Sequence, residues 1–373
     1  MGKDRVLVAM SGGIDSSVAA VLLHEEGYEV IGMTMKTWDY ASSGGTKKET
    51  GCCSLDSIND AREVAVSRGF PHYIIDIREE FGGQVIDHFT SEYLSGRTPN
   101  PCVMCNTHIK WDALLKRADK LGCDLIATGH YARLRKENGR FVISKGIDSN
   151  KDQSYALWGI SQESLGRTVF PLGGYKKMEV RDIATGMGLG SLAAKAESYE
   201  ICFVPDNDYR GFLKRLKPGL EQEVSGGEFV LGDGTVVGTH DGYPFYTIGQ
   251  RKGLGVALGY PVYVTEIQKA TNRVVLGGFD ELSRNGMYVK QLTLQKYDSL
   301  PLGSRLDTVT KVRYNDEGSP AVIEQVGGTM KVFFGEGVNA VAPGQAAVFY
   351  EGKDVIGGGW IHSSFKQGKL SPR

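Results

Sequence analysis

The opening of the chain constrains its fold more than any other segment. Residues 5–10 (RVLVAM) form a short apolar run followed by the letters SGG, which predicts a buried strand and a tight turn. Apolar residues within 18–23 then recur at helical spacing, and Gly27 supplies a helix stop. A buried strand that passes through a glycine turn into a helix is the repeating unit of open α/β sheets.

The same alternation continues through the first third of the chain. Further strands are predicted at 29–35, 72–77 and 124–130. Helices are predicted from a cap at Ser54 to about Arg68, then up to about Tyr93, and from about Thr107 to Leu121. Repeated strand–helix–strand units indicate an α/β fold with a doubly wound parallel sheet.

The rest of the chain changes character twice. Helical spacing dominates from Asp152 to about Leu216, and nine Lys or Arg residues gather between Arg167 and Lys217. Past Pro218, short β-rich runs alternate with glycine turns, which indicates two small β modules. We therefore expect an α/β domain with a helical extension (1–208), a small central β domain (209–280), a C-terminal β-barrel (281–364) and a tail (365–373).

Charge and composition disfavour several classes of protein. The net charge is −1, so any contact with nucleic acid must use local basic patches rather than a global field. We find neither the apolar region of a signal peptide nor an apolar run long enough to span a bilayer. Six cysteines among 373 residues do not fit a disulfide scaffold, which favours a cytoplasmic protein whose cysteines serve chemistry or metal binding.

Residues 11–17 (SGGIDSS) form the first candidate site, between a predicted strand and a helix, at the edge where open α/β sheets bind ligands. Glycines allow an anion to approach, and the amides at the helix start, with the hydroxyls of Ser11, Ser16 and Ser17, are donors to phosphate. The loop lacks the closing Gly-Lys-Ser/Thr of a Walker A motif, which favours pyrophosphate. Asp15 suits Mg²⁺ or a helix cap, and an ordinary turn is the alternative for the whole segment.

Residues 98–106 (TPNPCVMCN) form the second candidate site. Pro99 and Pro101 exclude a regular helix there, and Cys102 and Cys105 follow in a C-x-x-C spacing. Such a spacing suits a zinc ligand pair, a redox dithiol or an incidental loop.

Cys105 directly precedes a helix that is predicted to start near Asn106. Because a helix N-terminus lowers the pKa of a nearby thiol, we expect Cys105 to be a better nucleophile or ligand than an average cysteine. Cys202 lies in EICFVP (200–205), where the alternative to a reactive thiol is a small buried apolar residue. The remaining cysteines are expected to be non-catalytic; they are Cys52, Cys53 and Cys123.

Six strings resemble those of the tRNA-specific 2-thiouridylases, a family of pyrophosphate-loop ATPases. They are SGGIDSS, GRTPNPCVMCN, ATGHYA, DSNKDQSYALW, ICFV and TIGQRKGLG, in family order through about Gly255. VRYN (312–315) and PGQ (343–345) continue the resemblance in the C-terminal β module. The resemblance makes residues 1–208 an ATP-pyrophosphatase catalytic domain. The alternatives are an amidating ligase that shares only SGGxDSS, and a catalytically inactive tRNA-binding module.

The resemblance implies a reaction that uses ATP and Mg²⁺. ATP adenylates O2 of uridine-34, the wobble base, and a persulfide on Cys202, delivered by a sulfur-relay partner, attacks C2. Cys105 then attacks Cys202, which frees the sulfur and leaves a disulfide that a reductant reopens. AMP and pyrophosphate leave. The resemblance also implies a monomer, without membrane contact, that accepts the tRNAs for Lys, Glu and Gln.

The resemblance assigns binding residues as well. ATP contacts are expected from Ala9, Met10, Ser11, Gly12, Gly13, Ile14, Asp15, Ser16, Ser17, Met35 and Gly129. Contacts with tRNA are expected from Asn100, Pro101, Cys102, His130, Lys151, Asp152, Gln153, Arg313, Tyr314 and Gln345. The Lys and Arg residues of 167–217 fit contacts with the RNA backbone.

One position departs from the family pattern, because Cys102 stands where many members have Asp. Together with Cys105 and Cys202 it gives three thiols that suit a [4Fe–4S] cluster with one open iron. Structural zinc is disfavoured because it usually takes four protein ligands. We therefore expect Cys102 to be either a cluster ligand or a redox guard for Cys105.

Overall fold

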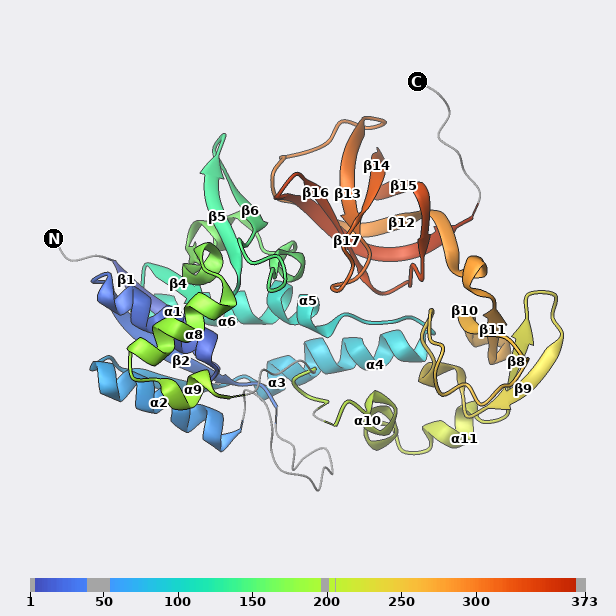
Figure 1. Ribbon diagram of the computed structural model, residues 1–373, viewed down its shortest axis with the longest axis horizontal. Coiled ribbons are helices and arrows are strands. Elements are labelled where there is room, and N and C mark those ends of the chain that lie inside the picture. Colours follow the sequence, from blue (N-terminus) through green and yellow to red (C-terminus); the bar gives the residue numbers. More distant parts are fainter. Residues whose placement is uncertain (1–3, 39–53, 196–200, 205, 367–373) are drawn as a thin grey trace. The chain divides into compact units, whose positions relative to one another are not determined.

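A computed structural model describes residues 4–38, 54–195, 201–204 and 206–366 (Figure 1). The chain divides into two compact units, each of which is discontinuous in sequence. The first unit comprises Met1–Ile86, Cys102–Asp208 and Lys353–Val355, and the second comprises Asp87–Pro101, Tyr209–Gly352 and Ile356–Arg373. The predicted domain boundaries at 208, 280 and 364 stay predictions.

The first unit is built on a parallel five-stranded sheet, in the order β3-β2-β1-β4-β7. Its strands are β1 (Arg5–Ala9), β2 (Glu29–Lys36), β3 (His72–Asp76), β4 (Leu125–Thr128) and β7 (Thr168–Val169). Val6, Leu7 and Val8 of the central strand are completely buried, as expected of a parallel strand that is covered on both faces. The predicted α/β fold and its four strands are confirmed.

Helices α1 (Ile14–Glu25) and α2 (Leu55–Arg68) pack on this sheet. Val6 and Val8 share a buried core with residues of both helices. Ser54 caps α2, as predicted, because its side chain accepts a hydrogen bond from the backbone N–H of Ser57. Helix α8 (Lys177–Gly186) packs against α1 and brings residues far apart in sequence to the start of α1.

The prediction that the prolines exclude a helix at residues 98–106 is wrong. Helix α5 (Pro101–Cys105) passes into a π-helical turn (Asn106–Lys110) and then into α6 (Trp111–Lys120). Pro101 occupies the first position of the helix, where its missing N–H would have no partner in any case. The helix therefore begins about five residues earlier than predicted, and Cys105 lies inside it.

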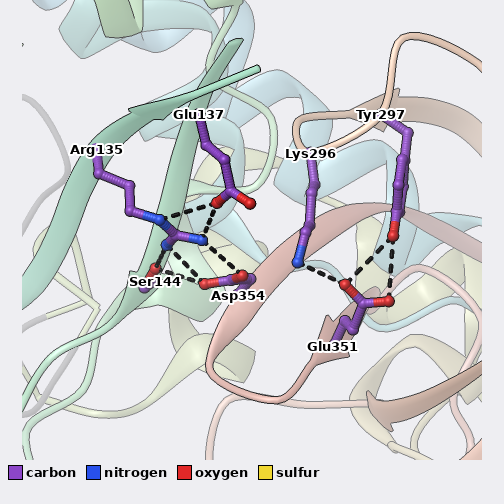
Figure 2. A network of polar contacts seen from close by, with 7 residues as sticks. All are labelled: Arg135, Glu137, Ser144, Lys296, Tyr297, Glu351 and Asp354. Atoms are coloured by element: carbon purple, nitrogen blue, oxygen red, sulfur yellow. Dashed lines mark hydrogen bonds and ion pairs between the residues drawn. The ribbon is translucent and has the colours of Figure 1, made fainter. Parts of the chain in front are cut away.

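A β-hairpin that the sequence analysis did not predict follows β4. It consists of β5 (Ala132–Glu137) and β6 (Arg140–Lys145), joined by Asn138 and Gly139, both with positive φ as in a type I′ turn. Arg135 of this hairpin donates hydrogen bonds to Glu137, Ser144 and Asp354 (Figure 2). Its two bonds to Asp354, of 2.7 and 2.8 Å, form a bidentate pair that raises the pKa of the guanidinium.

The second unit contains the predicted β modules. A four-stranded sheet has the order β10-β11-β8-β9. Its strands are β8 (Gly227–Leu231), β9 (Val236–His240), β10 (Tyr263–Gln268) and β11 (Arg273–Gly277). The helices of this unit are α4 (Asp87–Leu94), α10 (Tyr209–Leu216) and α11 (Leu220–Val224).

The predicted C-terminal barrel is confirmed, because six strands close on themselves through the pairing of β12 with β17. They are β12 (Ser283–Leu294), β13 (Arg305–Lys311), β14 (Ser319–Val326), β15 (Thr329–Asn339), β16 (Ala346–Glu351) and β17 (Asp354–Phe365). A separate contact group in Figure 2 joins Glu351 of β16 to Lys296 and Tyr297. Among the residues described, no helix has the length and apolar character needed to cross a membrane.

Candidate functional site

Residues 11–17, called here the nucleotide loop, connect β1 to α1 with little room for side chains. Gly12 has a φ of +73°, and a Cβ at this position would lie 1.9 Å from the carbonyl oxygen of Ser57. Gly13 is extended and forms the N-cap of α1 without a side-chain bond. Only glycine fits position 12, so the backbone amides at the start of α1 stay accessible to an anion.

The serines of the loop bond mainly within the loop. The N–H of Ser11 donates to Ser16 Oγ at 3.0 Å, and Ser16 Oγ donates to the carbonyl of Gly13 at 3.2 Å. Ser17 is fully buried, and within the described residues its hydroxyl has no hydrogen-bond partner. These bonds fix the loop in one conformation before any ligand binds.

Asp15 does not cap α1, since Gly13 does. Its carboxylate instead accepts hydrogen bonds from Tyr131 Oη at 2.7 Å and from Lys177 Nζ at 2.7 and 2.9 Å. Lys177 is the residue that sequence reasoning missed, because it was counted only among the basic residues of 167–217. Its burial depends on the packing of α8 against α1, for which the sequence around it carries no signal.

The edge of the sheet assembles as predicted. Ala9 at the end of β1 pairs with Met33 of β2 and with Thr128 of β4, so Met35 and Gly129 follow at the same edge. A Cβ on Gly129 would lie 2.8 Å from the backbone nitrogen of Ser16. Gly129 is therefore required for the close approach of two backbone segments and is not only a turn glycine.

The thiols of the candidate site differ in exposure. Cys102, in the first turn of α5, is exposed, Cys105 is buried and Cys202 is exposed. The helix-terminus argument made for Cys105 is wrong, because that argument applies to the first turn, where Cys102 lies.

Cys202 is not the small buried apolar residue that was the alternative for it. Its neighbours Phe203 and Val204 are buried instead, and Phe203 packs edge-on against Phe81. Cys123 is buried, as expected of a packing residue. Cys52 and Cys53 lie outside the described residues.

The fit of a [4Fe–4S] cluster can be tested on the three thiols. Among the described residues, which include Cys102, Cys105 and Cys202, no group of three Cys, His, Asp or Glu side chains is arranged to hold a metal ion. All four described cysteines are free thiols; they are Cys102, Cys105, Cys123 and Cys202. Among the described residues the three cysteines are therefore not assembled into a cluster site. The expectation that Asp15 holds Mg²⁺ stays a prediction, because Mg²⁺ on a nucleotide needs only one or two carboxylates.

His130 lies among aromatic rings in the first unit. Trp111 and Phe170 are its ring neighbours, at 5.9 and 6.3 Å between centroids, and Thr128 Oγ1 lies 2.8 Å from its Nδ1. Burial, with Lys110 adding to it, lowers the pKa of His130 to about 3. The imidazole is neutral at pH 7, so a role for His130 in RNA binding would be by hydrogen bonding or stacking and not by charge.

Residues 146–153, called here the bridging loop, contain three of the predicted tRNA contacts. Asp152 accepts hydrogen bonds from Gly146 N at 3.1 Å and from the backbone and hydroxyl of Ser154. Gln153 Oε1 accepts from the N–H of Tyr131 at 3.0 Å. The side chains of Asp152 and Gln153 thus organise the loop that presents Lys151.

The remaining predicted tRNA contacts lie in or at the second unit. Gln345 donates from Nε2 to the carbonyls of Thr98 and Pro99, at 3.2 and 2.9 Å, so it holds the segment that precedes Asn100 and Pro101. Arg313 and Tyr314 are exposed after β13, and Arg313 donates to the carbonyl of Asn339. The structure thus gives Gln345 a positioning contact and leaves the Arg313 and Tyr314 side chains at the surface.

Many of the basic residues of 167–217 also contact carboxylates. Five of the nine form ion pairs: Arg167 with Asp119, Lys177 with Asp15, Lys195 with Asp60, Lys214 with Glu221 and Lys217 with Glu223. Ion pairs between exposed side chains are weak, so the expectation that these residues contact the RNA backbone stays a prediction.

Comparison with known families matches the whole architecture. Residues 4–206 match a family described as tRNA methyl transferase HUP domain, and residues 214–278 match its PRC-barrel domain. Residues 284–361 match a family described as aminomethyltransferase beta-barrel domain. With the nucleotide loop at the carboxyl edge of the sheet, these matches define an RNA-modifying enzyme with a HUP domain followed by two β domains.

Full-length relatives name the family more narrowly than the domain descriptions do. The tRNA-specific 2-thiouridylase MnmA of Amoebophilus asiaticus is 74% identical over 98% of this chain and 97% of its own. The proteins of the same name from Cytophaga hutchinsonii and Salinibacter ruber are 74% and 60% identical, over 98% and 96% of this chain and 99% and 94% of their own. The chain belongs to the tRNA-specific 2-thiouridylase family of sulfurtransferases.

Solved structures show only a slight likeness. A 4-thiouridine synthetase in complex with RNA and ATP is 19% identical, with a TM-score of 0.34 over 58% of this chain and 51% of that one.

Proposed function

We propose that the protein uses ATP to replace O2 of uridine-34 in tRNA by sulfur, with a cysteine persulfide as the sulfur donor. One observation carries the proposal beyond family membership. The same unit contains a glycine loop that leaves the amides of a helix start open to phosphate and an exposed cysteine, Cys202, that an external sulfur donor can reach. Amidating ligases, the main alternative, have no need of such a thiol.

The nucleotide loop supports the activation step. The C2 carbonyl of uridine resists substitution until its oxygen becomes a good leaving group, and transfer of AMP to O2 supplies that activation. Backbone amides at the start of α1 stabilise the phosphates, and pyrophosphate leaves. Mg²⁺ bound to ATP would balance the phosphate charge. Although Asp15 is paired with Lys177, its side chain is still about one-third exposed.

The exposed and buried thiols support sulfur transfer in two exchanges. The terminal sulfur of a Cys202 persulfide attacks C2, and AMP departs with the former O2. The Cys105 thiolate then attacks Cys202 Sγ, which breaks the sulfur–sulfur bond and leaves the sulfur on C2. The products are 2-thiouridine and a Cys105–Cys202 disulfide, which an external dithiol reduces. A sulfur-relay protein delivers the persulfide to Cys202.

Recognition of tRNA requires that the target base leave its stack, so that the enzyme must hold both the base and the surrounding backbone. Asn100, Pro101 and Cys102 contact the base, together with neutral His130. Lys151 of the bridging loop and Arg313 and Tyr314 of the second unit contact the RNA around it. The accepted tRNAs are those for Lys, Glu and Gln, and the free protein is a cytoplasmic monomer.

No step is assigned to a [4Fe–4S] cluster, since the described cysteines do not form a group that would hold one. Cys102 instead serves as a redox guard: as an exposed thiol beside Cys105 in the same helix, it exchanges with the Cys105–Cys202 disulfide or with oxidants before Cys105 is lost.

The test uses aerobically purified protein, verified to be free of iron, with unmodified tRNA, ATP, Mg²⁺ and a persulfide donor. Mass spectrometry of the digested tRNA is expected to detect 2-thiouridine, to lose it in Cys202→Ser and Cys105→Ser, and to keep it in the matched control Cys123→Ser. Thiolation that persists in both Cys202→Ser and Cys105→Ser would overturn the persulfide mechanism. Absence of product with the iron-free protein, but product after anaerobic iron and sulfide reconstitution, would overturn the thiol-only route.

A further inference from the structure

We propose that Tyr131 and Lys177 are positioning residues that couple the bridging loop (146–153) to the nucleotide loop (11–17), so that tRNA and ATP alter each other's affinity. The inference rests on the proposed function, which assigns ATP to the nucleotide loop and tRNA to Lys151 and its neighbours. Neither residue was identified as part of the site by the sequence, and each joins both loops through different atoms.

The side chains of both residues bind the nucleotide loop at one point. Tyr131 Oη and Lys177 Nζ both donate to Asp15 Oδ1, at 2.7 Å each, and Lys177 also reaches Oδ2 at 2.9 Å. The Lys177 side chain is only 8% exposed, whereas that of Asp15 is 34% exposed. A buried ammonium requires its counter-ion, so Lys177 fixes the orientation of Asp15 and of the first turn of α1.

The backbones of the same two residues bind the bridging loop. The N–H of Tyr131 donates to Gln153 Oε1, and the N–H of Gln153 donates to the carbonyl of Tyr131, both at 3.0 Å. The N–H of Lys177 donates to Asp148 Oδ2 at 2.9 Å. Both ends of the bridging loop are therefore attached to residues whose side chains end on Asp15.

Packing prevents the two attachments from moving independently. Tyr131 is 2% exposed and belongs to a buried cluster with Ile14 and Val18 of α1 and Val180 of α8. Because a close-packed interior resists small displacements, movement of the bridging loop changes the position of Asp15 unless the Tyr131 and Lys177 contacts break. A ligand that orders one loop then favours binding at the other, and the coupling is reciprocal.

The test measures the Kd of a non-hydrolysable ATP analogue with Mg²⁺ for the full chain, with and without unmodified tRNA. For the wild type we expect tRNA to tighten binding of the analogue, by roughly fivefold or more. Lys177→Gln removes the ammonium and is expected to bring this factor close to one, while Tyr131→Phe removes only the hydroxyl and lowers the factor in part. Each variant should still bind tRNA alone with wild-type affinity.

Two matched controls separate coupling from general weakening. Tyr243→Phe also removes a buried hydroxyl bond, of 2.7 Å to the carbonyl of Leu94, but far along the chain from both loops, and Lys120→Gln removes an exposed ammonium. Both should keep the wild-type coupling factor. Thermal unfolding checks that each variant is folded, and Tyr131→Phe preserves the packed ring in case Lys177→Gln does not fold.

Wild-type coupling in both Tyr131→Phe and a folded Lys177→Gln would overturn the inference, as would a wild-type protein in which tRNA leaves the affinity for the analogue unchanged. The product assay distinguishes this failure from that of the proposed function. A wild type that makes 2-thiouridine without coupling overturns only the inference. A wild type that makes no 2-thiouridine, but shows coupling that is lost in Lys177→Gln and reduced in Tyr131→Phe, overturns only the proposed function.

Discussion

The nucleotide loop and the segment that contains Cys102 and Cys105 belong to the same unit but are held in place differently. The loop is held by close backbone contacts: Gly12 against Ser57 and Gly129 against Ser16 leave no space for a Cβ. The cysteine segment is a helix that begins at Pro101 and is interrupted by a π-helical turn directly after Cys105. Phosphate would thus be bound by backbone amides of a closely packed loop, whereas the thiol chemistry would use cysteine side chains that differ in exposure.

The π-helical turn explains why the cysteine segment is the less regular of the two. Within the described residues, the buried Asn106 Oδ1 and Thr107 Oγ1 have no hydrogen-bond partner, although Asn106 Nδ2 donates to the carbonyl of Ala156. Such turns occur often at functional sites, because they break the helical ladder at a local cost in stability. The closely packed part of the site is thus the part that binds ATP in the proposed function.

The largest loss is expected from a substitution in the closely packed nucleotide loop. Gly12→Ala forces a Cβ toward the Ser57 carbonyl at a φ of +73°, so the loop must shift. Overpacking of this kind costs about 1–3 kcal/mol, and 1.4 kcal/mol corresponds to tenfold in affinity. We expect ATP-analogue affinity measured by calorimetry to fall roughly tenfold or more.

The control for this change is the adjacent glycine. Gly13→Ala has an extended backbone, and the nearest atom to its Cβ is the Ser11 hydroxyl at 3.5 Å, so its effect should be several times smaller. Equal losses in the two variants would show that the loop requires glycine for flexibility in general and not for the contact with Ser57.

The cysteine segment can be tested by the reactivity of its thiols. Cys102 and Cys202 are exposed whereas Cys105 and Cys123 are buried, so iodoacetamide should modify the first pair about tenfold faster, as followed by peptide mass spectrometry. Urea-unfolded protein, in which all four thiols react at similar rates, is the control. If Cys105 reacted first in the folded protein, its thiol would be more activated than its burial allows.

The last prediction concerns His130 and the pH dependence of stability. Its pKa of about 3 lies below the ordinary value of 6.5, so the unfolded chain binds a proton that the folded state excludes. This destabilising contribution of His130 is absent above pH 6.5. It grows as the pH drops from 6.5 toward 3, and it lowers the free energy of unfolding by about 2 kcal/mol at pH 5. His130→Gln should flatten this slope in urea titrations.

His72 also has a pKa that burial lowers, so it adds to the acid destabilisation of the wild type and should remain in the variant. A wild-type slope in His130→Gln would mean that His130 is protonated in the folded state at these pH values.

Local sequence signals predicted much of the fold, and they failed where burial or partners are distant. Four of the five strands of the first sheet, the Ser54 cap and the barrel follow from apolar runs, capping residues and glycine turns, which act within a few residues. The fifth strand, β7, was not predicted, because it lies in a stretch where helical spacing dominates. The start of α5 was missed because Pro was weighed as a helix breaker and not as a first helical residue. The hairpin β5–β6 was missed although Asn138-Gly139 is a strong turn signal.

The candidate site shows the same limit. The glycine loop and its edge of the sheet could be predicted, because the strand, the turn and the helix start are adjacent in the sequence. The contact of Lys177 with Asp15 joins residues 162 apart in sequence, and the burial of Cys105 depends on packing that its neighbours do not reveal. Spacing alone also suggested three cysteines for a cluster, which their arrangement does not support.

The most direct test of the central claim is the redox state of Cys105 and Cys202 after one turnover. Protein carrying a persulfide on Cys202 is mixed with tRNA and ATP without reductant, and peptide mass mapping is combined with quantification of AMP and 2-thiouridine. We expect one Cys105–Cys202 disulfide and one AMP for each 2-thiouridine formed. Formation of 2-thiouridine while both cysteines stay reduced would contradict the persulfide mechanism.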